Sequence, residues 1–142
     1  MTIEFIRRPQ GLGEPLGKYS HVSIAPSGQI VTVAGQVGIT DSGELAGDGG
    51  LTAQTQQAFR NVATALESVG LGTADIFKTT TYLVGAGNID EFMAARTAAF
   101  GELFPDGHFP PNTLLVVQRL VEERFTVEVE AFAIRADGQS PG

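Results

Sequence analysis

The first stretch with apolar residues at helical spacing covers residues 51–69. Thr52 is expected to be the N-cap of this helix, and Gly70 is expected to end it. Polar residues occupy the other positions, which is typical of a helix that covers a core with one side. The apolar stripe consists of Ala58, Val62, Ala65, Leu66 and Val69.

A second helical stretch begins at Asn88 and extends to about Phe104. Glu91 follows Asn88 at the spacing of a capping box, which favours a helix start at this point. The residues expected to face the core are Ala95, Ala99, Phe100 and Leu103.

Short β-branched and apolar segments before, between and after these helices predict strands. Ser27-Gly28 separates the first two segments and predicts a hairpin, and Glu122-Glu123 lies in the turn before the last one. The resulting order is β-β-α-β-α-β-β, an α+β fold with two helices on one face of a sheet. The segments are residues 21–25, 30–37, 76–84, 113–120 and 125–134.

Several of these strands are apolar on both faces, although two helices can cover only one. Leu114 and Val116 alternate with Leu115 and Val117 along one strand. The uncovered face is therefore expected to pack against other copies of the chain in a cyclic assembly. Only 18% of residues are charged, which also favours an oligomer, but a chain with 18 Gly can have uncharged loops for simpler reasons.

Length and composition narrow the function classes. The 142 residues predict one domain over residues 1–136 with a flexible tail at 137–142. The chain has no Cys, and its two His are in no ligand-spaced motif, so neither a disulfide nor a metal site is expected. The net charge of -7 argues against nucleic-acid binding. The sequence shows neither a signal pattern nor a long apolar run, which predicts a cytoplasmic protein without a membrane partner.

The last strand carries the first candidate chemistry. Glu128, Glu130 and Phe132 share one face of this strand because side chains alternate. Two carboxylates about 7 Å apart could act as an acid/base pair, or they could simply form a solvated strand face. Phe132 and Ile134 make this face partly apolar, which favours a site.

The segment Pro110-Pro111-Asn112-Thr113 is the second candidate. The two prolines hold the chain extended as it enters the strand. Asn112 and Thr113 then lie at a strand start, where backbone N–H groups can bind a ligand carboxylate. Together with the last strand, this segment is expected to form one wall of a small-molecule site, although an ordinary loop-to-strand transition has the same pattern.

Six short motifs follow one another between Lys18 and Ile134. They are Tyr19-Ser20, Val33-Ala34-Gly35-Gln36, Gln54-x-x-Gln57-x-x-x-Asn61, Lys78-Thr79-Thr80-Thr81-Tyr82-Leu83, Pro110-x-x-Thr113 and Val127-Glu128-Val129-Glu130-Ala131-Phe132-Ala133. In this order and spacing they resemble the RidA/YjgF family of enamine/imine deaminases. The resemblance implies a chorismate-mutase-like α+β domain and a homotrimer whose sheets line a central barrel, with ligand clefts between subunits.

The resemblance also implies an activity, the cofactor-independent hydrolysis of 2-imino acids to 2-keto acids and ammonia. Glu128 matches the glutamate that orients the attacking water, and Asn112 stands where the family has the arginine that holds the substrate carboxylate. Ala34 replaces a frequent serine, and the counterpart of Glu130 is structural. Further positions that match the cleft are Tyr19, Gly35, Thr113 and Leu114.

Asn112 decides how far the activity can be transferred. A guanidinium forms charge-assisted, two-pronged bonds to a carboxylate, whereas an amide forms neutral ones, so the replacement should cost ~2 kcal/mol of affinity or more. Arg119 is expected to point to the opposite face of its strand. Arg96 is the better substitute for binding substrate, unless it is a solvated helix residue. Ala95-Arg96 followed by Phe100-Gly101 resembles a branch of the superfamily that lacks the cleft arginine.

Three hypotheses follow. The protein is an imine or enamine hydrolase that uses Glu128, or a trimer that binds a small carboxylate or an imino- or keto-acid metabolite without turnover. Asn112 favours binding alone, and Glu128 favours the enzyme. The family has also been described as ribonucleases or translation inhibitors, but the charge of -7 and the lack of a basic groove argue against RNA as a substrate.

Overall fold

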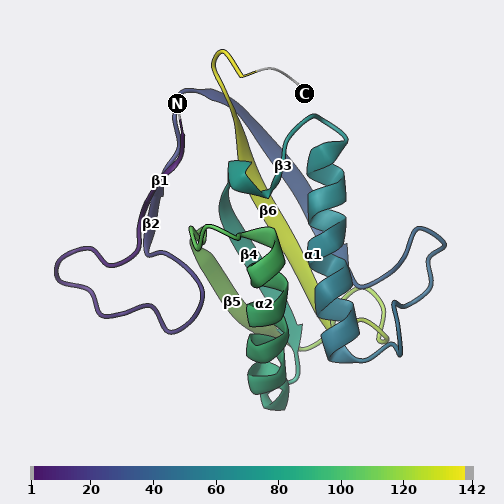
Figure 1. Ribbon diagram of the computed structural model, residues 1–142. Helices are drawn as coiled ribbons and strands as arrows, with labels where there is room; N and C mark the ends of the chain where they lie inside the picture. The colour runs from purple at the N-terminus through teal and green to yellow at the C-terminus, as the bar shows by residue number, and fades with distance from the viewer. Residues whose placement is uncertain (1, 140–142) are drawn as a thin grey trace.

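The computed structural model describes residues 2–139. A four-stranded sheet in the order β3-β6-β4-β5 forms one layer, and α1 (Leu51–Glu67) and α2 (Ile89–Leu103) form the second layer on one of its faces (Figure 1). β4 and β5 are parallel and the other neighbours are antiparallel, so the sheet is mixed and the predicted α+β class is confirmed. The strands are β3 (Gly28–Val37), β4 (Ile76–Val84), β5 (Asn112–Val117) and β6 (Val127–Ala136).

The predicted hairpin around Ser27-Gly28 is wrong. β2 (Val22–Ile24) pairs with β1 (Glu4–Ile6), which precedes it at the start of the chain, and β3 pairs with β6 instead. The small β1-β2 ladder lies beside the main sheet (Figure 1). The Ser23 hydroxyl donates a hydrogen bond of 2.6 Å to the carbonyl of Phe77, which ties this ladder to β4 rather than to β3.

The first helix ends at Glu67, two residues before the predicted end, and its start is not capped as predicted. Gly70 has a positive φ of 74°, a conformation that glycine adopts without steric cost, and its N–H donates to the Glu67 carbonyl. Gly50 precedes the first residue of α1, and Thr52 does not cap the helix. The Thr52 hydroxyl instead donates to Glu91 Oε2 over 2.9 Å, which links the two helices.

The capping box predicted for the second helix is also absent. Asn88 does precede α2, after a short 3₁₀ turn (Ala86–Asn88). Its side-chain amide, however, donates to the Val84 carbonyl over 2.9 Å. The Glu91 carboxylate accepts the hydrogen bond from Thr52 instead of one from the backbone at Asn88. Local pattern thus located the helix start, while contacts to other elements determined which hydrogen bonds form there.

The core lies between the helices and the sheet. From β6, four residues are fully buried, each with a relative exposure of 0%. They pack against Ala58, Val62 and Leu66 of α1 and Phe92 and Phe100 of α2, and burial of one such large apolar side chain contributes roughly 1.5–3 kcal/mol. Val69, which was expected in the stripe, lies beyond the helix end and is 39% exposed. The four residues of β6 are Val127, Val129, Ala131 and Ala133.

The polar motif of α1 is structural. Gln54 is fully buried, and its amide donates to the carbonyls of Gly49 and Arg124 while its oxygen accepts the N–H of Thr126. Asn61 donates to the carbonyl of Val37 at the end of β3 and to that of Ile39 just beyond it. These side chains satisfy backbone groups of the connecting loops, which would otherwise be buried without partners.

Apolar side chains also lie on the sheet face opposite the helices, which we call the open face. Ile30 on β3 is 68% exposed and Leu115 on β5 is 44% exposed. This pattern agrees with the sequence expectation that both faces of these strands are apolar. The assembly that would cover the open face stays a prediction.

The end of the chain folds back on the domain. Asp137 donates its N–H to the Ser27 carbonyl, and Gln139 donates to Asp75, so residues 137–139 are hydrogen-bonded. The remainder of the predicted tail, residues 140–142, lies outside the described residues. Within residues 2–139, no helix is long and apolar enough to cross a membrane.

Candidate functional site

The predicted site residues lie on two sides of the sheet. In the ladder between β4 and β6, Glu128 pairs with Tyr82 and Glu130 pairs with Thr80, so these side chains share the open face. Asn112 pairs with Thr79 on the helix side, where Thr79 is buried. Within a single chain, Asn112 therefore does not face the same side of the sheet as Glu128, whereas Thr113 of the same segment does.

Glu128 and Gly35 are brought together on the open face. A Cβ atom placed on Gly35 would lie 2.1 Å from Glu128 Oε2, a distance that no side chain allows. The irregular register of β3 between Val33 and Gln36 brings this stretch of backbone against the carboxylate. Gly35 thus gives Glu128 room to lie directly against the β3 backbone.

The Glu130 carboxylate accepts a hydrogen bond from a neighbouring side chain. The Tyr82 hydroxyl donates a hydrogen bond of 2.8 Å to Glu130 Oε1. This bond raises the pKa of Tyr82, and burial and the charges of Glu130 and Glu128 raise it further. Glu128, in contrast, makes no hydrogen bond or ion pair with any of residues 2–139, so its carboxylate is available to bind water or a ligand.

Lys78 and Thr113 add a polar pair to the same face. The Lys78 ammonium donates to Thr113 Oγ1 over 2.8 Å. Thr113 was predicted from the sequence, whereas Lys78 was not considered as a site residue. The signal for Lys78 was its even spacing from Thr80 and Tyr82, which places all three side chains on one face of β4.

Asn112 has structural partners on the helix side. The hydroxyls of Thr79 and Thr81 donate to its Oδ1 atom over 2.9 and 3.0 Å. Both threonines are buried, so their hydroxyls need this acceptor. Leu114, two residues further on, packs against the core. Neither residue presents its side chain to the open face.

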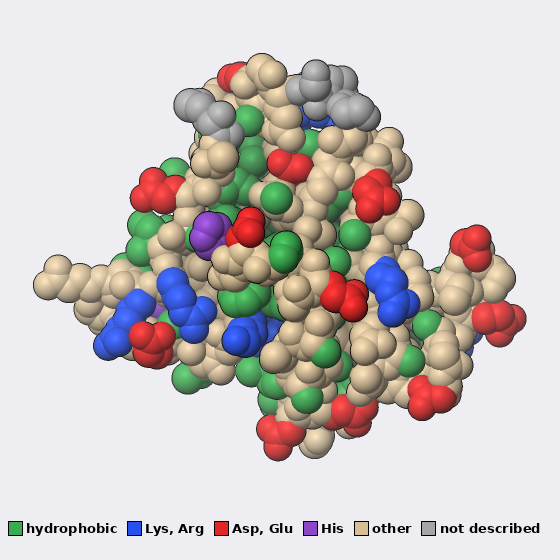
Figure 2. All heavy atoms as spheres, in the orientation of Figure 1, with side chains coloured by type: hydrophobic (Ala, Val, Ile, Leu, Met, Phe, Trp, Pro, Cys, Tyr) green, Lys and Arg blue, Asp and Glu red, His purple; other side chains and the backbone are tan. Residues whose placement is uncertain are grey.

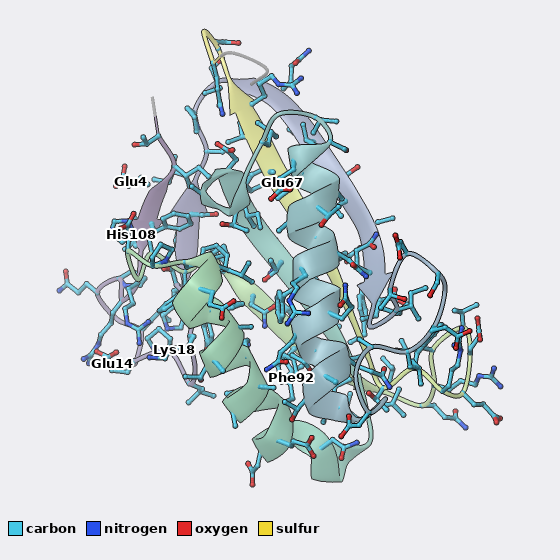
Figure 3. The ribbon with its side chains drawn as sticks, turned by 45° about the vertical axis from the view of Figure 1, so that its right-hand side comes forward. Glu4, Glu14, Lys18, Glu67, Phe92 and His108 are labelled. Carbon is cyan, nitrogen blue, oxygen red and sulfur yellow. The ribbon has the colours of Figure 1, made fainter. Side chains whose placement is uncertain are left out.

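Arg96 is not a solvated helix residue, because it is only 2% exposed. Its guanidinium lies 5.3 Å from the ring centre of Phe92 and 5.8 Å from that of Phe100. Burial lowers the pKa of Arg96, since a charged group is less stable away from water. Figure 3 shows Phe92 between the two helices and Lys18 beside α2.

Tyr19 lies near Arg96 in the loop that joins β1 and β2. Its hydroxyl accepts the N–H of Leu16 over 3.1 Å, and its carbonyl accepts a hydrogen bond from Arg7. The negative charge of an ionised Tyr19 would act against the lowering of the Arg96 pKa, which shows that the two groups are close. The structure therefore separates Glu128, Gly35 and Thr113 from a second group, which comprises Tyr19, Arg96, Asn112 and Leu114.

Charge is distributed unevenly over the helix side of the molecule. Figure 2 shows several Lys and Arg side chains, with an acidic side chain among them, over the β1-β2 loop, whereas acidic side chains predominate over the rest of the surface in view. Arg119, the other cation considered from the sequence, donates to the carbonyls of Leu120 and Val121 beyond the end of β5. Residues 2–139 contain no group of three or more side chains that could hold a metal ion.

Comparison with known proteins identifies relatives over nearly the whole chain. A family profile described as Endoribonuclease L-PSP matches residues 10–135. An uncharacterized protein of Streptomyces coelicolor is 34% identical over 136 residues, which cover 95% of this chain and 96% of that protein. A RutC family protein of Haemophilus influenzae is 31% identical over 119 residues, which cover 81% of this chain and 86% of that protein.

A solved structure shares the fold closely. A protein of unknown function of the conserved Rid family from Yersinia pestis superposes with a TM-score of 0.82 at 30% sequence identity. The similarity covers 95% of this chain and 100% of the Yersinia chain. Sequence and structure thus agree on the same group of relatives.

Proposed function

The chain belongs to the RidA/YjgF family, and from this premise we propose that it hydrolyses a small imine or enamine at Glu128 on the open face. The observation that carries the proposal is the unoccupied carboxylate of Glu128, which lies against Gly35 while its neighbour Glu130 is bonded to Tyr82. One carboxylate is thus available for chemistry, and the other has a structural partner.

The reaction needs only a water molecule and a group that accepts and returns a proton. Glu128 would accept a proton from water as the water oxygen attacks the imine carbon, which gives a carbinolamine. Glu128 returns this proton to the imine nitrogen as the carbinolamine forms. It would then transfer the hydroxyl proton of the carbinolamine to the nitrogen as the C–N bond breaks, so that a ketone or 2-keto acid and ammonia are released. No cofactor enters this scheme.

The site requires a second copy of the chain. The open face is one side of a sheet with exposed apolar residues such as Ile30 and Leu115, and we expect that it does not enclose a ligand by itself. Homotrimers are typical of this family. We therefore place Glu128 in a cleft that a neighbouring subunit completes, with a small imino or keto acid as the ligand.

A second candidate function is binding of such a metabolite without turnover. The contacts of Asn112 favour it, because its amide oxygen already accepts two threonine hydroxyls on the helix side. Asn112 therefore does not replace the carboxylate-binding arginine on the open face. Cleavage of RNA is less compatible with a chain of net charge -7, despite the description of the family profile.

The decisive experiment measures ammonia release from 2-iminopropanoate generated in situ. Wild type is expected to accelerate the release, and Glu128→Gln should reduce the rate about 100-fold or more, because general acid–base groups contribute about 10²–10⁴-fold. Glu130→Gln is the matched control on the same strand face, since an amide oxygen can still accept the Tyr82 hydroxyl.

Two results would decide against the enzyme. A rate that is equal in wild type and Glu128→Gln would exclude Glu128 as the catalytic residue. Saturable binding of pyruvate that persists in Arg96→Met, with no acceleration of ammonia release, would establish the second candidate.

A further inference from the structure

Arg96 is the one arginine that donates to no oxygen among residues 2–139. Each of the others donates at least one hydrogen bond to a carbonyl, amide or carboxylate oxygen. Among residues 2–139, the Arg96 Nη2 atom donates a hydrogen bond only to the Met93 sulfur, at 3.0 Å, and the buried Nε atom has no hydrogen-bond partner. A guanidinium carries five N–H donors and favours carboxylate or phosphate oxygens, so this side chain lacks the partner that its chemistry requires.

Arg96 borders an open hollow of about 340 Å³ between α2 and the β1-β2 loop. Two further cations, Arg7 and Lys18, line the same hollow, and no acidic residue does. Arg7 Nε forms an exposed ion pair of 3.9 Å with Glu14, whereas no ion pair is found for Lys18 or Arg96 among residues 2–139. In a chain of net charge -7, three converging cations are an exception that attracts negative charge.

The surroundings of Arg96 hold its guanidinium in place. The rings of Phe92 and Phe100 flank it, and a Cβ atom on Gly17 would lie 2.5 Å from its Nη2 atom. The loop backbone can approach this closely only because residue 17 is glycine. A cation fixed in this way loses little conformational freedom when it binds a ligand, which favours affinity.

We infer that Arg96, together with Arg7 and Lys18, forms a binding site for a small oxyanion, either a carboxylate or a phosphate. An anion in the hollow would supply the missing acceptor for the guanidinium and offset the cost of its burial. The hollow has the size of a small-metabolite site. It lies on the side of the sheet opposite Glu128, so the inference does not depend on the proposed hydrolysis.

The test compares anions at equal ionic strength. Thermal unfolding and titration calorimetry are followed with sodium pyruvate, sodium phosphate and, as the reference, sodium chloride. Wild type should show a saturable rise in Tm with pyruvate, phosphate or both, because a ligand that binds the folded state stabilises it. A response to pyruvate alone assigns the site to carboxylates, and a response to phosphate alone assigns it to phosphates.

Arg96→Met should abolish the response to anions and leave the Tm of the ligand-free protein equal or higher, since it removes a buried charge without a partner. A purely structural Arg96 would give the opposite pattern, a lower Tm with an unchanged response. Lys18→Gln changes an exposed residue and should weaken binding about tenfold, so it tests the site even if Arg96→Met does not fold.

Arg60→Gln is the control, because it removes an exposed arginine on α1 outside the hollow, and it should respond as wild type does. Glu128→Gln should also retain the response, which separates this site from the proposed hydrolysis. The inference is overturned if neither anion exceeds chloride, or if Arg96→Met and wild type respond equally.

Discussion

The two sides of the sheet differ in how they surround a charged side chain. On the open face, the Glu128 carboxylate lies against Gly35 on a surface that the chain does not enclose. On the helix side, Arg96 is enclosed by the chain's own aromatic rings and loop. If both proposals hold, the carboxylate site depends on assembly, whereas the cation site is built within one subunit.

The largest expected effect comes from preventing assembly. Ile30→Asp places a charge on the open face, where Ile30 is 68% exposed, and should yield monomers without measurable imine hydrolysis. Binding of anions near Arg96 should be unchanged, because that hollow is built within one subunit. Size-exclusion chromatography with light scattering, together with the ammonia assay, measures both parts.

The control for this variant is Ile89→Asp. Ile89 is 37% exposed at the start of α2, where an acidic residue suits the helix terminus, and its substitution should preserve assembly and activity. Full activity in monomeric Ile30→Asp would show that Glu128 does not need a neighbouring subunit.

Substitutions in β5 are expected to have an intermediate effect, on the free energy of unfolding. The side chains of this strand alternate between the two sides of the sheet. Asn112→Ala leaves the buried hydroxyls of Thr79 and Thr81 without an acceptor and should lower the free energy of unfolding by about 2 kcal/mol. Thr113→Ala, on the open face, should change it by less than about 0.5 kcal/mol because Thr113 is exposed. Urea unfolding measures both values, and equal losses would contradict the assignment of Asn112 to a structural role.

The smallest expected effect is a pH dependence of the folding stability that is caused by Tyr82 on the open face. The pKa of Tyr82 is raised from 10.0 in the folded protein, so folding stability is fully present below pH 10 and falls as the pH rises through the folded pKa. Tyr82→Phe removes this dependence. Urea unfolding between pH 8 and pH 11 should therefore show a shallower decline for the variant, and identical slopes would mean that the hydrogen bond to Glu130 does not persist in solution.

Sequence patterns were sufficient to predict the helices and strands that bury a long apolar stripe. Both helices, the stop at Gly70 and the alternation along β6 were predicted, because each depends on periodicity over many residues. β1 has three residues, too few for a periodic signal, and the partner of β2 was decided by its contact with β4. Pairing between distant strands depends on tertiary contacts that local patterns do not contain.

The division of the candidate residues between two sides could not be predicted for a related reason. When a strand is apolar on both faces, its sequence does not indicate which face the helices cover, so the side of Asn112 was undetermined. The burial of Arg96 did leave a signal. Phe92, Arg96 and Phe100 follow one another at intervals of four, which places the arginine on the apolar stripe of its helix.

The hydrogen bond between Tyr82 and Glu130 also has an optical consequence. The chain contains two Tyr and no Trp, so its intrinsic fluorescence comes mainly from Tyr19 and Tyr82. Tyr82 lies beside Glu128 on the open face, and Tyr19 lies in the loop near Arg96. Each side of the sheet therefore carries its own chromophore, and the two single Tyr→Phe variants would allow ligand binding to be followed on one side at a time without an added label.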